Sequence, residues 1–195
     1  MAKVVVVTPA MDTIHIMHHI AVLQLKRDSN TAFDFALSSL IYDARNILAS
    51  RAIKFGHERV LWLDSDMTFE PDLINRLSAR IDEGYDMVSG IYIGRKPTYP
   101  PCIYKDIIPG SHAVPYTDYP KDSMFEIAGC GFGGVIMKTE LIQEVGEKFG
   151  YPFSPIVGLG EDLSFCYRVA QLGKKIYCDS SIKLGHIGYK EFRPE

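Results

Sequence analysis

The chain is short of cysteine, of excess charge and of long hydrophobic runs. Its 195 residues include four cysteines, Cys102, Cys130, Cys166 and Cys178, and none forms a C-x-x-C pair. This spacing argues against a metal finger and favours reduced thiols. The formal net charge of −3 gives no overall attraction to nucleic acid or to an anionic membrane. The N-terminal apolar run is too short for a signal peptide or a membrane span. We therefore expect a cytoplasmic protein, in a bacterium or in a host cell, with no membrane span.

Alternating strand and helix patterns fill the first half of the chain. Apolar residues make up 47% of the sequence, which is ordinary for a globular domain with a real core. Buried strands are predicted at 3–7, 31–37, 59–63 and 86–91, with helical patterns between them. This order predicts a single α/β domain of Rossmann-like type, with a mostly parallel central sheet flanked by helices.

The pattern breaks between residues 94 and 124. Six prolines lie between Pro97 and Pro120, and tyrosines are frequent there, so we expect an irregular loop or lid without regular elements. A glycine-rich segment, a strand at 135–138 and further helices follow. The sequence thus predicts a nucleotide-binding half at 1–93, the loop at 94–124, and an acceptor and catalytic half at 125–195.

An Asp-x-Asp pair provides the first candidate for chemistry. Asp64 and Asp66 directly follow the predicted strand at 59–63, and ligands of open α/β sheets lie at the carboxyl ends of strands. Two carboxylates in such a turn suit one hard divalent cation, which in turn neutralises a diphosphate. The alternative is that Asp64 and Ser65 simply cap the next helix.

Two further candidates lie near the C-terminal end. Glu161 and Asp162 open a helix after a glycine-rich stretch, and His186 follows the last predicted strand. Acids in a first helical turn often serve only the helix dipole, and a lone histidine is more often structural than a ligand. Their order relative to Asp64 and Asp66 is what makes a catalytic interpretation attractive.

These motifs together resemble a known family. The segments VLWLDSDMTF, GCGFGG and GEDLSFCYRVAQLGKKIYCDSSIKLGH are similar to those of GT-A fold glycosyltransferases, especially the compact family-2-like members found in bacteria and phages. The helix SLIYDARNILASRAI and the segment IYIGRKPTYPP also resemble that family. The resemblance runs from Val4 to His186, and it implies a GT-A fold and sugar transfer from a nucleotide-diphosphate donor, with a UDP-sugar favoured.

The resemblance also implies roles for individual residues. Asp66, Asp64 and His186 would hold Mn²⁺ or Mg²⁺, and Asp162 would be the catalytic base of an inverting reaction, with Glu161 beside it. The nucleotide would contact Thr8, Pro9, Ala10, Arg45, Asn46, Asp64 and Ser65. Gly131 and Gly133 would approach the acceptor closely. Independently of the resemblance, Arg95 and Lys96 follow the fourth predicted strand at the same sheet edge as Asp64 and Asp66, so we expect them to contact phosphate or acceptor.

Larger family members carry an additional acceptor region, whereas this sequence ends nine residues after His186. We therefore expect an acceptor site that is small, completed by a second subunit of a homo-oligomer, or formed by residues 94–124. The acceptor itself, whether a saccharide, a protein or a modified nucleobase, is left open. Closure of 94–124 over the donor is a further expectation, since tyrosines stack on sugar and base rings.

Other classes of protein fit parts of the pattern. Asp64-Ser65-Asp66-Met67-Thr68 matches the Asp-x-Asp-x-Thr motif of haloacid-dehalogenase-like phosphatases, in which Asp64 would be the nucleophile. Two strand–helix units precede the motif here, which argues against that class. A nucleotidyltransferase usually has a glycine-rich loop after its first strand, and TPAMDT has none. A non-catalytic nucleotide-sugar binding module is the remaining alternative.

Overall fold

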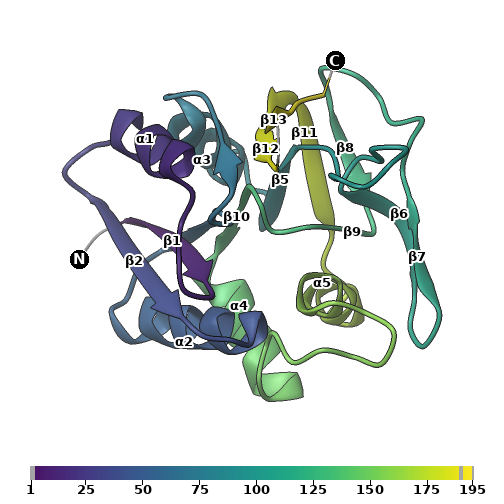
Figure 1. Cartoon of the computed structure of the whole chain (residues 1–195). Coiled ribbons are helices and arrows are strands. Elements are labelled where there is room, and N and C mark those ends of the chain that lie inside the picture. The colour runs from purple at the N-terminus through teal and green to yellow at the C-terminus, as the bar shows by residue number, and fades with distance from the viewer. Residues whose placement is uncertain (1–2, 189–190, 195) are drawn as a thin grey trace.

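The apolar strands of the sequence meet in one seven-stranded sheet (Figure 1). The computed structural model describes residues 3–188 and 191–194. In order across the sheet, the strands are β2 (Thr31–Leu37), β1 (Val4–Ala10), β3 (Arg59–Trp62), β10 (Val135–Lys138), β5 (Met87–Ile91), β11 (Ile176–Lys183) and β8 (Met124–Ile127).

The sheet is mixed but mostly parallel. Strands β1, β2, β3, β5 and β11 run in one direction, because β1 pairs in parallel with β2 and β3, β5 pairs in parallel with β11, and β10 is antiparallel to both β3 and β5. The predicted α/β class is therefore confirmed. The four N-terminal strands of the sheet are not all neighbours, since the antiparallel β10 separates β3 from β5.

Helices cover both faces of the sheet (Figure 1). On one face lie α1 (Ile16–Gln24) and α3 (Leu73–Asp82); on the other lie α2 (Ile41–Lys54), α4 (Thr139–Phe149) and α5 (Glu161–Gln171). Alternate residues of β1 enter two separate cores, Val4 and Val6 in one and Val5 and Val7 in the other. No described helix is both long enough and apolar enough to cross a membrane.

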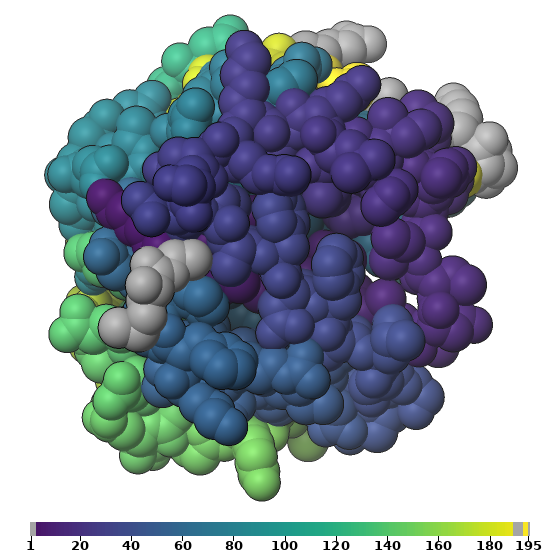
Figure 2. Space-filling view, turned by 90° about the vertical axis from the view of Figure 1, so that its left-hand side faces the viewer, coloured from purple at the N-terminus to yellow at the C-terminus, as the bar shows by residue number. Residues whose placement is uncertain are grey.

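The free edge of β2 lies between α1 and α2 in Figure 2. The backbone N–H of Phe35 donates to Asp34 Oδ1 at 2.8 Å, and the carbonyl of Phe35 accepts from Arg51 Nη1 at 3.1 Å. Arg51 also pairs with Asp34 at 3.0 Å. Two side chains therefore occupy backbone groups that a neighbouring strand would otherwise use, which protects this edge against sheet extension.

The segment from 94 to 124 is not irregular throughout, so that expectation is wrong. Strands β6 (Ile103–Ile108) and β7 (His112–Pro115) form an antiparallel hairpin, and β6 also pairs with β9 (Gly129–Cys130). Pro109 and Pro115 lie just after one strand and at the end of the next, where a missing N–H costs no ladder bond. At the hairpin tip, Gly110 N donates to the carbonyl of Val157 at 3.0 Å.

A second small sheet joins the chain segments that carry the candidate metal ligands. It consists of β4 (Met67–Thr68), β12 (Gly185–Ile187) and β13 (Glu191–Phe192) in the order β13-β12-β4. The pairing sets His186 opposite Met67 and Gly185 opposite Thr68. The residue after Asp66 is thereby fixed to the strand that holds His186.

Four fully buried aromatic side chains form the core between the sheet and α2, α4 and α5: Trp62, Phe132, Phe153 and Phe165. The ring of Phe153 stacks on Phe165 at 4.8 Å and meets the edge of Trp62 at 4.9 Å. Offset and edge contacts of this kind add to the hydrophobic gain of burial.

Phe153→Ala is expected to lower the free energy of unfolding by about 3–5 kcal/mol, because it leaves a cavity in this cluster. Chemical denaturation of the purified protein measures the change. Tyr151→Ala, two residues earlier and 74% exposed, is the matched control and should change stability by about 0.5 kcal/mol or less. Equal losses from the two variants would contradict the packing described here.

Candidate functional site

The candidate residues gather at one edge of the central sheet. Strands β1, β3, β5 and β11 end there, and β10 begins there because it runs in the opposite direction. The Asp64–Asp66 turn follows β3, and the glycine-rich segment 129–134 leads into β10. This edge is where open α/β sheets place their ligands.

A buried arginine is the centre of the site. Arg45 projects from α2 and donates from Nη2 to Asp64 Oδ1 at 2.7 Å and from Nε to Glu161 Oε1 at 3.0 Å. Its guanidinium lies 5.6 Å from the ring centroid of Trp62 and 5.3 Å from that of Phe132. Two acids from distant parts of the sequence are thus held by one planar cation.

Burial and charge act in opposite directions on Arg45. Desolvation lowers the pKa of its guanidinium, but the charges of Asp64 and Glu161 outweigh this effect and hold the pKa above its ordinary value. Arg45 Nη1 is buried and has no hydrogen-bond partner among the described residues. The arginine therefore stays charged, and it depends on its two acids for compensation.

Asp162 differs from the acids around it, because no ion pair of the described residues neutralises it. Burial first, and then the charge of the neighbouring Glu161, raise its pKa to about 7 against the opposing charge of Arg45. Asp162 Oδ1 accepts the backbone N–H of Leu163 at 2.7 Å. A carboxyl with a pKa near neutrality can take up and release a proton under physiological conditions.

Asp66 and His186 form a pair at the other side of the site. Asp66 Oδ2 lies 3.6 Å from His186 Nε2 and 2.8 Å from Arg95 Nη1. Burial raises the pKa of Asp66, but the hydrogen bond and charge of His186 together with Arg95 outweigh it and hold the pKa below its ordinary value. His186 Nδ1 lies 2.9 Å from the carbonyl oxygen of Ile93.

The chemistry of this pair fits a divalent cation. A carbonyl only accepts, so Nδ1 of His186 carries the proton, and in the neutral ring the Nε2 lone pair faces the Asp66 carboxylate. Such a contact is favourable when a proton or a metal ion lies between the two atoms. Their 3.6 Å separation falls within the roughly 3–4.2 Å that two ligands at about 2.1 Å from one ion can span. The bond from the second ring nitrogen to a carbonyl is typical of metal-binding histidines.

No group of three or more histidine, cysteine, aspartate or glutamate side chains within 3–188 and 191–194 is arranged to hold a metal ion. The reason is visible in the ion pairs: Asp64 turns to Arg45, while Asp66 shares its carboxylate with Arg95. The predicted third ligand, Asp64, is therefore engaged elsewhere in this conformation.

Tyr92 connects the two sides of the site. Its ring meets His186 edge-on at 5.3 Å, and its hydroxyl lies 3.3 Å from the backbone N of Gly133. A Cβ on Gly131 would meet the Tyr92 hydroxyl at 2.1 Å and Asp162 Oδ2 at 3.6 Å. The glycines thus make room for the tyrosine, whereas the sequence suggested an approach to the acceptor. The position directly after a buried strand is the signal that could have identified Tyr92.

The first strand reaches the site through a histidine that the sequence did not single out. His18 on α1 donates from Nδ1 to the carbonyl of Met67 at 2.9 Å, and its Nε2 lies 3.3 Å from Thr8 Oγ1. Burial lowers the pKa of His18, although the bond to Met67 opposes this. Pro9 and Ala10 are buried beside Thr8 at the end of β1.

The remaining predicted residues have other surroundings. The carbonyl of Ser65 accepts the backbone N–H of His15 at 2.9 Å, which attaches the start of α1 to the Asp64–Asp66 turn. Asn46 Oδ1 accepts the backbone N–H of Phe153 at 3.0 Å and so supports the aromatic cluster. Lys96 is exposed, and its carbonyl accepts the backbone N–H of Tyr99 in a turn.

Comparisons with known proteins establish the fold and nothing narrower. No protein-family model matches the chain, and no curated protein matches its sequence. Among solved structures it is similar to the crystal structure of A197 from STIV, with a TM-score of 0.69 and 21% identity. The match covers 95% of this chain and 86% of A197. The two proteins therefore share an α/β arrangement over nearly their whole length.

The raised pKa of Asp162 predicts a pH dependence of stability. The folded protein holds this proton more tightly than the unfolded chain, whose ordinary value is 3.8, so stability is lost as pH rises from about 4 to about 7. In Asp162→Asn this loss should be absent, so that between pH 4 and pH 8 the wild type loses on the order of 4 kcal/mol of stability more than the variant does. Denaturation series at several pH values measure it. Asp118→Asn, at an exposed position, is the control, and identical pH profiles for wild type and Asp162→Asn would contradict the assignment.

Proposed function

We propose that this protein is a group-transfer enzyme that acts on nucleotide diphosphates with a divalent cation. More specifically, we propose an inverting glycosyltransferase that moves a sugar from a nucleotide-diphosphate donor, with a UDP-sugar favoured, to an acceptor hydroxyl. The observation that carries the proposal is the Asp66–His186 pair, in which the carbonyl of Ile93 holds Nδ1 of the histidine. This pair lies on the far side of Tyr92 from the half-buried Asp162. The resemblance of the motifs to GT-A glycosyltransferases narrows the class.

The charge balance supports the need for a cation. Among the described residues, the site brings four carboxylates, Asp64, Asp66, Glu161 and Asp162, against two guanidinium groups, Arg45 and Arg95. A diphosphate bound there without a counterion would add more negative charge to an acidic, partly desolvated site. Mn²⁺ or Mg²⁺ held by Asp66 and His186, with Asp64 as the further candidate, would neutralise the departing diphosphate.

The reaction needs a proton acceptor as well. Asp162, deprotonated above pH 7, takes the proton of the acceptor hydroxyl. At the same time the oxygen of that hydroxyl forms a bond to the anomeric carbon of the donor sugar. The bond between that carbon and the diphosphate oxygen breaks, and its electron pair leaves with the nucleoside diphosphate. Arg45 holds Glu161 and Asp64 in place through its two ion pairs. Arg95, 45% exposed and also bonded to the carbonyl of Ile187, would exchange Asp66 for a phosphate oxygen.

The first test concerns binding of the leaving group. UDP or GDP should bind in calorimetric titrations only with Mn²⁺ or Mg²⁺ present, because the carboxylates repel the free diphosphate. Asp66→Ala should weaken this binding by at least tenfold, whereas Glu70→Gln, an exposed acid four residues later, should leave it unchanged. Equal affinity in manganese and in EDTA would remove the basis for the metal assignment.

The second test separates binding from chemistry. Asp162→Asn should leave donor binding nearly intact and lower the release of nucleoside diphosphate from a nucleotide-sugar by about two to four decades. In the wild type the rate should rise with pH up to about 7 and then level off, since the base must be deprotonated. Asp43→Asn, an exposed acid on α2, is the control. Full activity in Asp162→Asn would show that Asp162 is not the base. Glu161 and Asp162 would then only stabilise the N-terminus of α5 through the helix dipole.

The same experiments distinguish the other classes. Hydrolysis of a simple phosphate ester that is lost in Asp64→Asn would favour a phosphatase, although Asp64 Oδ1 is held by Arg45 rather than free for attack. Metal-dependent nucleotide binding without turnover of any nucleotide-sugar would favour a binding module. Ordering of residues 94–124 on donor binding stays a prediction, and hydrogen exchange with and without donor addresses it.

A further inference from the structure

Strand β11 is interrupted just before the segment that carries His186. Cys178 pairs with Ser89 and Lys183 pairs with Ile91, so five steps along β11 correspond to two steps along β5. The additional residues form a bulge at 179–182, and Asp179 and Ser180 within it are 1% exposed. Bulges of this kind redirect a strand and often lie next to functional sites.

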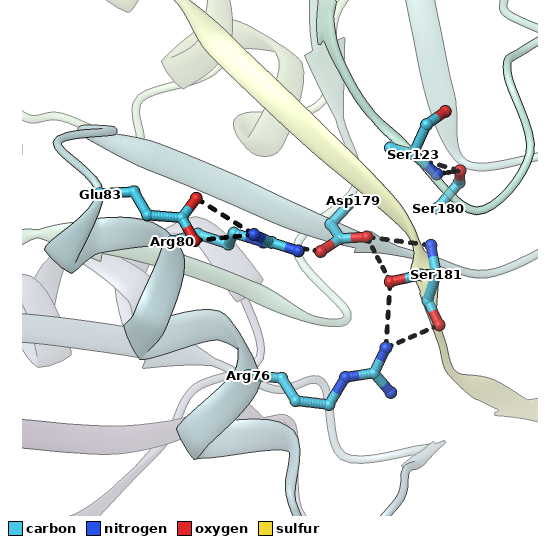
Figure 3. Close-up of polar contacts among 7 residues, drawn as sticks. All are labelled: Arg76, Arg80, Glu83, Ser123, Asp179, Ser180 and Ser181. Atoms are coloured by element: carbon cyan, nitrogen blue, oxygen red, sulfur yellow. Dashed lines mark hydrogen bonds and ion pairs between the residues drawn. The ribbon is translucent and has the colours of Figure 1, made fainter.

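Two arginines of α3 hold this bulge (Figure 3). Arg80 Nε donates to Asp179 Oδ2 at 2.9 Å, while the other oxygen of Asp179 accepts from Ser181 N at 3.0 Å and from Ser181 Oγ at 2.6 Å. Arg76 Nη2 donates to the carbonyl of Ser181 at 2.9 Å and lies 3.0 Å from Ser181 Oγ. The bulge is therefore bonded from two turns of one helix, by Arg76 at its backbone and by Arg80 at the Asp179 side chain.

The opposite side of the bulge is fixed as well. Ser180 Oγ lies 2.7 Å from the carbonyl of Pro120 and accepts the backbone N–H of Ser123 at 3.1 Å (Figure 3). Asp179 and Ser180 are thus satisfied by neighbours on two different segments, which leaves this part of the chain little freedom to slide.

The register that the bulge sets continues directly into the site. Beyond it, Leu184 N donates to the carbonyl of Ile91 at 2.8 Å, and Ile187 N donates to the carbonyl of Asp66 at 2.7 Å. Between these two bonds lies His186, whose Nδ1 reaches the carbonyl of Ile93. A shift of β11 by one residue would move His186 away from Asp66 and put a neighbouring residue in its place.

We propose that Arg76, Arg80 and Asp179 are positioning residues that place His186 Nε2 against Asp66 for cation binding. The inference rests on the proposed function, and it assigns a role in that function to residues that lie outside the site. Because α3 begins shortly after the Asp64–Asp66 turn and β4, one helix is tied to both of the segments that supply ligands. Arg76, Arg80 and Asp179, called the clamp below, thereby fix the distance between Asp66 Oδ2 and His186 Nε2, which is 3.6 Å.

The test uses the whole protein and Mn²⁺ alone as the probe, with two test variants, one control and one reserve variant. Asp179→Asn and Arg76→Gln should weaken Mn²⁺ binding by about 10–100-fold in calorimetry, as loss of outer supports usually does. Glu83→Gln is the matched control, since Glu83 contacts the same Arg80 at 2.8 Å from the exposed side without touching the bulge (Figure 3). Its Mn²⁺ affinity should equal that of the wild type. Arg76→Lys, a milder change, serves if Arg76→Gln does not fold.

A second readout needs no metal. Long-range ¹H–¹⁵N correlation spectra of His186 should show protonated Nδ1 in the wild type and in Glu83→Gln, and a loss of this preference in Asp179→Asn and Arg76→Gln. Folded variants with a lower melting temperature but unchanged Mn²⁺ affinity and unchanged tautomer would overturn the positioning role. Absence of Mn²⁺ binding in the wild type would instead overturn the proposed function, and the tautomer measurement would still decide whether the clamp positions the ring.

Discussion

Burial of the Arg45 charge is the constraint around which the site is built. A guanidinium between Trp62 and Phe132 has lost its water, so it requires acids within hydrogen-bond distance. Asp64 and Glu161 supply them from segments almost one hundred residues apart. The two acids then cannot move independently, and the turn after β3 and the start of α5 are joined across the mouth of the sheet. Removing both acids would leave the buried Arg45 charge without compensation.

This arrangement leaves the remaining acids with distinct properties. Asp162 lies beside the Arg45 group without sharing its ion pairs, so burial keeps its pKa near neutrality. Asp66 is drawn to the other side by Arg95 and His186, and its pKa stays low. One carboxyl is therefore suited to proton transfer and another to charge neutralisation, within one site and around one tyrosine. Separation of this kind is what a transfer reaction with an ionised leaving group requires.

Local sequence patterns predicted where strands and helices occur, but not which strands pair with one another in the sheet. Apolar runs such as those of β1 and β3 mark buried strands at once, and Gly160 with Glu161 marks the start of α5. The insertion of β10 between β3 and β5 depends on pairing over more than forty residues, which no local pattern encodes. The proline-rich segment was expected to be irregular because prolines break helices, yet β6 and β7 accommodate them at their ends. The acids and His186 were proposed from their positions at the ends of strands and helices and from the family resemblance. Tyr92 also follows a buried strand, whereas His18 acts through tertiary contacts that no local pattern shows.

The central claim is that Asp66 and His186 share a divalent cation at the edge of the sheet where Asp162 lies. Crystals grown with Mn²⁺ and UDP, with anomalous diffraction data collected at the manganese edge, test it most directly. The account predicts an anomalous peak within bonding distance of Asp66 Oδ2 and His186 Nε2, with Arg95 released from Asp66 toward phosphate. A peak located elsewhere, or none while Arg95 still pairs with Asp66 beside bound UDP, would contradict it.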